Sequence, residues 1–354
     1  MFTSHTYELS NNIQIFFTDS GPPPHSDNYT TLVVFHGSAF NGAGYEKLHS
    51  VAHPLNLRTV IWNRRDYPGS TPYTDSELED LRQGRRVFME KIGVQVGEFL
   101  EQFIENENIP KVSSDHKAGG IAIMGCSMGN SSAMALFSDP KLSPPETYLK
   151  LKPYIKDLVL YEPPHLCFAY PLPPGVDVYN PLNNSDQTIP GSKAPNFKFW
   201  VSSFYNHRDI NSADLRDMDT PTKGSSDATI TKWSQEEFQR YVNETATVRS
   251  ELPMFVEPMQ TTLKELSDRV FYDEGLTRTY FPDLKLTMVV GTRSNWMCTW
   301  GSLETQRIHD LRVEKGAAVR PMKTYRIIGG NHYAHWEDPN TLLKKALEGM
   351  TRDN

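Results

Sequence analysis

A pentapeptide of the pattern G-x-S-x-G, residues 125–129, joins two segments of contrasting character. Residues 121–124 before it are apolar and predict a buried strand, whereas residues 131–137 after it are small and have a helical pattern. A strand that turns sharply into a helix at such a pentapeptide holds the serine on a strained backbone, with its hydroxyl exposed above the sheet edge. Both glycines are needed because a Cβ there would crowd the crossing strand and helix. The pattern predicts that Ser127 is a catalytic nucleophile.

Alternating strand and helix patterns on both sides of the pentapeptide predict an α/β fold. Segments 7–9 and 13–17 predict a hairpin, and the continuous apolar run 31–35 is typical of a strand buried on both faces. Further strands are expected at residues 58–62, 155–161, 284–290 and 324–328. Helices are expected at residues 76–107 and 302–315, and from Asp338 as N-cap to about Glu348. Such a series implies a mostly parallel sheet with helices on both faces.

The alternation stops between about residues 163 and 281. This segment is rich in Pro, Ser, Asp and aromatic residues, and its helical patterns are short, as at residues 233–241. A chain of 354 residues exceeds the usual size of a single core, so a large domain with an insertion is expected. We expect one α/β domain formed by residues 1–162 and 282–354, with residues 163–281 inserted into it.

Charge and composition narrow the range of partners and compartments. A net charge of −7 with a pI of about 5.9 argues against a nucleic-acid or anionic-membrane partner, because both attract basic surfaces. No apolar run approaches the roughly 20 residues that cross a bilayer, and the N-terminus lacks the pattern of a secretory signal. The three cysteines neither suggest a disulfide framework nor have zinc-binding spacing. A cytoplasmic protein is expected, and the sequence gives no indication of its oligomeric state.

A histidine follows the last expected strand in the sequence Gly-Gly-Asn-His of residues 329–332. Parallel strands bring their C-terminal loops to one sheet edge, so His332 is placed to act as the base for Ser127. The alternative is an ordinary hydrogen-bonded loop histidine, and His335 is a second candidate for the base. The H-x-x-H spacing of the two histidines could also suggest a metal site, but no third ligand stands at a recognisable spacing, and no metal is expected.

The loop after the strand at residues 31–35 begins with the sequence His-Gly-Ser-Ala. A tetrahedral intermediate needs two backbone N–H donors aimed at its oxyanion. Met128, which follows the nucleophile, supplies one of them, and Ser38 or Ala39 is placed to supply the other. The alternative is a simple tight turn at His36 and Gly37, and His36 itself need not be catalytic.

Taken in chain order, four segments resemble the α/β-hydrolase superfamily. They are residues 35–38, residues 63–70 (Asn-Arg-Arg-Asp-Tyr-Pro-Gly-Ser), the pentapeptide 125–129, and residues 329–339. The resemblance covers nearly all of the chain outside the insertion and is specific for the superfamily, but not for a substrate. It implies Ser127 as nucleophile, His332 as base, and Ser38 and Met128 as oxyanion donors. It also implies that residues 163–281, inserted after the sixth strand, form a cap or lid over the active site.

One departure from the superfamily pattern concerns the acid of the catalytic triad. Most members place it a few residues after the seventh strand, where this chain has Ser294, and no carboxylate follows until Glu304. Glu162, directly after the sixth strand, is the expected substitute, because that strand neighbours the one that carries the serine. Some members carry their acid there, including a fungal acyl-CoA hydrolase type of secondary metabolism to which the chain is distantly similar. The alternative for Glu162 is a loop carboxylate at the hinge of the cap.

Aromatic residues cluster in the inserted segment and after the seventh strand. Phe40, Trp200 and Trp296 are the expected substrate-binding residues, because clustered aromatic side chains can line a pocket for a hydrophobic group. Equally, most of these aromatics could form the small core of the cap itself. The basic pair Arg64 and Arg65 is expected to form structural ion pairs, with contact to an acidic substrate as the alternative.

Together these residues predict a serine hydrolase without a cofactor, which cleaves an ester, lactone or thioester of a hydrophobic small molecule through an acyl-serine intermediate. The same fold also hosts cofactor-free lyases, isomerases and cyclases, and some members are ligand receptors, because a fold does not fix the chemistry. Because no acid follows the seventh strand, a non-hydrolytic enzyme or a receptor is the alternative interpretation.

Overall fold

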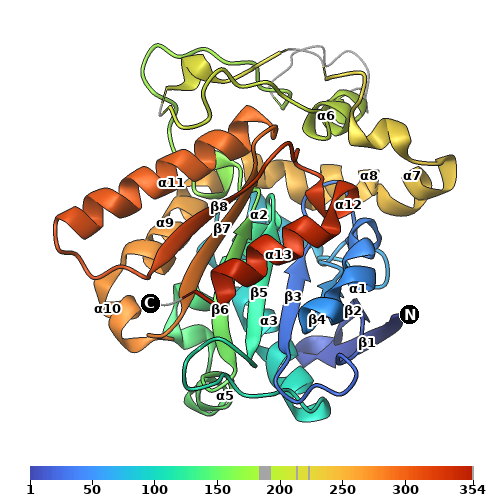
Figure 1. The fold of residues 1–354 in the computed structure, drawn as a ribbon, viewed down its shortest axis with the longest axis vertical. Helices are drawn as coiled ribbons and strands as arrows, with labels where there is room; N and C mark the ends of the chain where they lie inside the picture. The colour runs from blue at the N-terminus through green and yellow to red at the C-terminus, as the bar shows by residue number, and fades with distance from the viewer. Residues whose placement is uncertain (183–192, 213, 222–223, 353–354) are drawn as a thin grey trace.

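A twisted sheet forms the centre of the protein (Figure 1). The computed structural model describes residues 1–182, 193–212, 214–221 and 224–352. In these residues the sheet has eight strands in the order β1-β2-β4-β3-β5-β6-β7-β8. The strands are β1 (Thr3–Leu9), β2 (Ile13–Asp19), β3 (Thr30–Phe35), β4 (Leu57–Trp62), β5 (Ile121–Cys126), β6 (Ile155–Tyr161), β7 (Lys285–Gly291) and β8 (Met322–Ile327). The strand order of the sheet and the expected hairpin of β1 and β2 confirm the predicted α/β class.

All pairings from β4 through β8 are parallel, whereas β1–β2 and β2–β4 are antiparallel. Every residue of β3, β5, β6 and β7 is buried, as the continuous apolar runs predict for strands covered on both faces. Strand β1, at one edge, is mostly exposed. The pairs Phe35–Gly125 and Cys126–Tyr161 show that neighbouring strands end at one level. The loops that follow these strands therefore meet at the carboxyl ends of the strands, which we call the sheet edge below.

Helices cover both faces of the sheet. One face packs against α1 and α13, around the apolar side chains Leu48, Leu342, Leu343 and Ala346. The other face packs against α3, α4 and α9, whose buried side chains form the largest apolar cluster. The helices are α1 (Lys47–Ala52), α2 (Asp75–Arg82), α3 (Arg86–Asn106), α4 (Gly129–Ala135), α5 (Pro145–Leu151), α6 (Lys193–Val201), α7 (Gln235–Tyr241), α8 (Glu244–Ala246), α9 (Met259–Tyr272), α10 (Glu274–Thr279), α11 (Trp296–Glu314), α12 (Ala334–Glu337) and α13 (Pro339–Met350).

The residues between β6 and β7 leave the sheet and return to it. Helices α6, α7 and α8 lie across the end of the sheet, at the top of Figure 1. Helix α9 runs back along the side of the sheet and packs against α4, with Met259, Leu263 and Val270 in the main apolar cluster. The expected boundaries of the insertion, 163 and 281, stay a prediction. No helix in the described ranges is long and apolar enough to cross a membrane.

Two predicted helices differ from the structure. The expected helix 76–107 is divided into α2 and α3, because Gly84 adopts a left-handed φ of 62° between them. Helix α11 begins at Trp296 and not at residue 302, because Asn295 caps it by accepting the N–H of Cys298. The early turns of α11 are buried all round and carry no charged residue, so they lack the exposed charged face by which a surface helix is recognised.

Candidate active site

Ser127 occupies the sharp turn between β5 and α4. Its φ is 52°, in the left-handed region that residues other than glycine rarely adopt. Its N–H donates to the carbonyl of Tyr161, which ties the turn to the end of β6. A Cβ on Gly125 would lie 2.3 Å from the Cα of Asn130, and one on Gly129 would lie 2.4 Å from the carbonyl oxygen of His36. The two glycines therefore allow the close strand–helix crossing that the sequence predicts.

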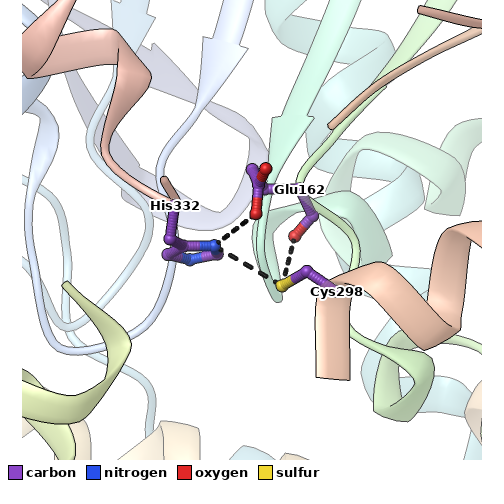
Figure 2. A group of neighbouring side chains, drawn as sticks. All are labelled: Glu162, Cys298 and His332. Atoms are coloured by element: carbon purple, nitrogen blue, oxygen red, sulfur yellow. Dashed lines mark hydrogen bonds and ion pairs between the residues drawn. The ribbon is translucent and has the colours of Figure 1, made fainter. Parts of the chain in front are cut away.

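Glu162 and His332 are in direct contact, although 170 residues separate them in the sequence. The Nδ1 of His332 lies 2.9 Å from Oε2 of Glu162 (Figure 2). Glu162 follows β6 and is fully buried, and His332 follows β8 and is 4% exposed. Strand β7 lies between these two strands in the sheet. The contact fixes the orientation of the imidazole ring and leaves its Nε2 free to face another group.

Ser294 stands where the superfamily pattern places the acid, and its hydroxyl donates to Oε2 of Glu162. The N–H of Gly291 donates to the other oxygen, Oε1, at 2.6 Å. These donors and His332 offset the cost of burying the carboxylate. No sequence pattern indicates that Ser294 contacts Glu162, since the contact depends on the lateral pairing of β6 with β7. The serine at the position expected for the acid thus contacts the carboxylate of Glu162.

Cys298, at the start of α11, completes the group drawn in Figure 2. Its Sγ lies 3.2 Å from the carbonyl oxygen of Glu162 and 3.4 Å from Nδ1 of His332. Ligand atoms of these three residues lie within 4.8 Å of one another, close enough to share a metal ion. Burial, together with the charge of Glu162, raises the pKa of the Cys298 thiol well above its ordinary value, so the thiolate that binds metals is disfavoured. The donor set therefore fits a hydrogen-bonded group better than a metal site.

Ser127 and His332 line the same small cavity, of about 10 Å³. Its other walls are formed by Gly37, Ser38, Phe40, Tyr45, Phe197, Val201, Tyr333 and His335. A space of this size holds about one water molecule. The structure therefore brings together the predicted nucleophile, the predicted base and one predicted oxyanion residue around one small cavity.

The loop after β3 passes directly over Ser127. A Cβ on Gly37 would lie 2.9 Å from the Cβ and 3.6 Å from the Oγ of the serine. The N–H of Ala39 donates to the hydroxyl of Tyr67 at 3.0 Å, so it is not free to bind an oxyanion. Ser38 N–H and Met128 N–H have no acceptor among the residues that the structure describes. Of the two expected alternatives in this loop, the geometry favours Ser38.

The second candidate base, His335, has other partners. Its Nδ1 lies 3.3 Å from the hydroxyl of Tyr161, and its ring stacks on Tyr45 with 3.9 Å between ring centroids. Burial lowers its pKa well below the ordinary histidine value. His36 is also buried and neutral: its Nε2 accepts the N–H of Arg64 at 3.1 Å. Neither histidine contacts Glu162 in this structure, whereas His332 does.

The three expected substrate-binding aromatics belong to one apolar cluster. Phe40 also lines the cavity with Ser127. Trp200 and Trp296 are buried in the cluster, and their indole N–H groups donate to the carbonyls of Pro221 and Tyr179. Neither tryptophan lines the cavity. This cluster joins residues of the inserted segment to α11 and to the loops after β3 and β8, so it is not a core of the inserted segment alone.

Arg64 and Arg65 form ion pairs, as expected. Arg65 binds Glu77, and Arg64 binds Glu251 of the inserted segment at 2.6 Å. The Arg65–Glu77 pair is buried, and in the other pair Glu251 is buried whereas Arg64 is partly exposed. Sequence reasoning did not identify Glu251, because no motif surrounds it and its partners precede it by more than 180 residues.

Known structures share this architecture at low sequence identity. Cfl2 from Burkholderia cenocepacia is 13% identical, covers 99% of this chain and 96% of its own, and superposes with a TM-score of 0.57. Epoxide hydrolase A from Mycobacterium thermoresistibile is 11% identical with a TM-score of 0.52, over 100% of this chain and 99% of its own. An evolved variant of a potato epoxide hydrolase is 13% identical with a TM-score of 0.52, over 98% of both chains. No protein-family model matches the sequence, and no curated protein sequence is significantly similar to it.

The sheet order, the position of Ser127 after β5 and these structural matches together define the class. The protein has the α/β-hydrolase fold. Since every match reported above is far below 25% identity, the likeness extends to the fold and not to a reaction or substrate.

Proposed function

We propose that the protein is a serine hydrolase that cleaves an ester, lactone or thioester of a hydrophobic small molecule. The observation that carries the proposal is the contact of His332 with Glu162 at 2.9 Å, beside the cavity that His332 shares with Ser127. A nucleophile, a base and a group that orients the base are the parts needed for acyl transfer.

In the proposed reaction, Nε2 of His332 accepts the proton of the Ser127 hydroxyl as Oγ attacks the carbonyl carbon. The N–H groups of Ser38 and Met128 stabilise the oxyanion. Collapse of this intermediate breaks the bond to the leaving group, which takes the proton from His332. Water then attacks the acyl carbon as His332 takes one of its protons. The bond between this carbon and Oγ breaks, His332 returns the proton to Oγ, and the acid product leaves. Glu162 holds the imidazole orientation and stabilises its cationic form throughout.

The residues around Ser127 support a hydrophobic acyl group. Phe40, Phe197, Val201 and Tyr333 form the apolar part of the wall. The proposed reaction requires neither a metal ion nor a cofactor, because Ser127, His332 and Glu162 supply the nucleophile and the proton transfers.

Labelling with a fluorophosphonate, combined with turnover of p-nitrophenyl esters, thioesters and lactones, tests this proposal. We expect stoichiometric labelling of the wild type at Ser127, turnover of at least one substrate class, and loss of both in Ser127→Ala. Labelling without turnover of any class would favour a lyase, isomerase or cyclase instead. A wild type that is neither labelled nor active would favour a receptor.

A further inference from the structure

A buried carboxylate of the inserted segment lies against the oxyanion loop, defined here as residues 37–39. Glu251 ends a short π-helical turn, Thr247–Glu251, and its side chain is 2% exposed. It pairs with Arg64, which follows β4 and whose side chain is 12% exposed. The carboxylate therefore comes from the segment over the sheet edge, whereas its partner comes from the sheet domain.

This carboxylate reaches every residue of the oxyanion loop, directly or through one partner. The Ser38 hydroxyl donates to Oε2 of Glu251 at 2.5 Å. Tyr67 donates its hydroxyl to Oε1 at 3.0 Å and accepts the N–H of Ala39 at 3.0 Å. Arg64 donates both to Oε1 at 2.6 Å and to the carbonyl of Gly37 at 3.1 Å. Removal of the Glu251 charge would therefore weaken the contacts that hold all three residues of the oxyanion loop.

The loop needs these contacts because its backbone is strained. Ala39 has a φ of 70°, a conformation that a residue with a Cβ keeps only where its surroundings hold it. The inserted segment also contacts the loop through its backbone: Asn243 N–H donates to the carbonyl of Ala39 at 2.9 Å, and Phe40 pairs with Val242. The inserted segment and the loop thus form one hydrogen-bonded unit.

The position of the loop determines whether Ser38 N–H can reach an oxyanion at Ser127. Gly37 already lies in contact with the serine, since a Cβ there would be 2.9 Å from the serine Cβ. Oxyanion donors act over hydrogen-bond distances, and a displacement of about 1 Å can cost about 100-fold in rate. A small shift of the loop would therefore act on the transition state more than on substrate binding.

We propose that Glu251 is a positioning residue, through which the inserted segment holds the oxyanion loop in its catalytic conformation. This inference rests on the proposed function, because it assigns a role in stabilising the oxyanion at Ser127. It means that the oxyanion hole is complete only while the inserted segment is seated on Arg64, Tyr67 and Ser38.

Steady-state kinetics of Glu251→Gln tests the proposal, with Glu77→Gln as the matched control. Glu77 forms the neighbouring buried pair with Arg65, at 2.5 Å, and does not contact the oxyanion loop. With the best substrate of the wild type, we expect Glu251→Gln to lower kcat about 10- to 100-fold with KM changed less than about threefold. Glu77→Gln should keep kcat within about threefold of the wild type.

A transition-state mimic separates positioning from a general structural effect. A boronic acid that forms a tetrahedral adduct on Ser127 should bind Glu251→Gln more weakly by the same factor as kcat/KM falls, because both depend on the oxyanion hole. Tyr67→Phe, which removes the hydroxyl between Glu251 and Ala39, should show the same correlation. This variant decides the question if Glu251→Gln does not fold.

Unchanged kcat in the folded variants of an active wild type would refute this inference and leave the proposed function intact. Equal losses of kcat in Glu77→Gln, or a change confined to KM, would also refute it. A wild type without turnover of any ester, thioester or lactone would refute the proposed function, and this inference with it.

Discussion

Glu162 and Ser127 share an unusual backbone conformation at the ends of neighbouring strands. Their φ values are 51° and 52°, and each left-handed residue of this kind costs about 1–3 kcal/mol. The N–H of Glu162 donates to Val289 on β7, and that of Ser127 donates to Tyr161 on β6. These bonds hold both turns at the sheet edge. Two strained residues side by side at the edge where the loops converge are typical of a functional site.

Replacement of Glu162 by Gln should lower kcat by about 10⁴, as expected if this residue acts as the acid of a triad. Glutamine would preserve the shape but not the charge that stabilises the imidazolium. Steady-state kinetics with the best ester substrate measures the effect. Glu304→Gln is the control, because Glu304 pairs with Arg307 in a turn of α11, and such pairs contribute little. A larger loss in the Glu304 variant would contradict the assignment of Glu162.

Helix α6 forms part of the cavity wall next to Ser127. Two of its residues, Phe197 and Val201, line the cavity of about 10 Å³. The acyl group of the proposed substrate needs more room than one water molecule, so we expect the walls to move apart when it binds. The position of α6 next to the cavity depends on how the inserted segment folds. The sequence of this segment has no periodic pattern strong enough to predict where α6 lies.

Truncation of one aromatic side chain on α6 should change acyl-chain preference. In Phe197→Ala, we expect kcat/KM for a four-carbon acyl ester to rise roughly tenfold relative to an acetyl ester, because the wall of the cavity recedes. Phe199→Ala on the same helix should leave this ratio unchanged, since Phe199 contacts Gly224 and not the cavity. Kinetics with a series of p-nitrophenyl esters tests the pair. An equal change in both variants would show that α6 does not form the acyl pocket.

The sheet as a unit carries buried ionisable groups at the end opposite the candidate active site. Asp157 on β6 is fully buried, and its carboxylate oxygens accept no hydrogen bond from the described residues. The positive charges near it are Lys156, Lys285 and Arg352, the last at 3.9 Å. Burial outweighs them and raises the pKa of Asp157 to about 7. The folded state therefore binds this proton more tightly than the unfolded state.

The sign of the pH dependence follows from that shift. The stabilising effect of the Asp157 proton is complete below the unfolded pKa of about 4, and it is lost as the pH rises through about 7. A shift of about three units corresponds to about 4 kcal/mol of unfolding free energy across this window. Asp157→Asn should flatten the stability profile between pH 4 and pH 7, as measured by urea unfolding. Asp310→Asn, at a side chain that is 56% exposed, should keep the wild-type slope. A steep slope in Asp157→Asn would contradict the prediction.

Local pattern was sufficient to predict the α/β class, the strands and the turn at Ser127. Apolar runs indicate strands buried on both faces, and the two glycines of the pentapeptide indicate a close crossing, because each is a property of neighbouring residues. The same patterns missed the break between α2 and α3 and the buried start of α11. In both places the helix boundary depends on a single residue, Gly84 between α2 and α3 and the cap Asn295 before α11, within a stretch whose apolar pattern is continuous.

Sequence pattern alone is enough to order the elements and to place Ser127 and His332 at the same end of the sheet. The contacts made there follow from the three-dimensional fold: Glu162 against His332, Ser294 against Glu162, and Glu251 against the oxyanion loop. The physical reason is distance along the chain. Periodicity records how each residue is buried within its own element, whereas these contacts join residues 132 to 213 positions apart and depend on strand register and on the docking of the inserted segment.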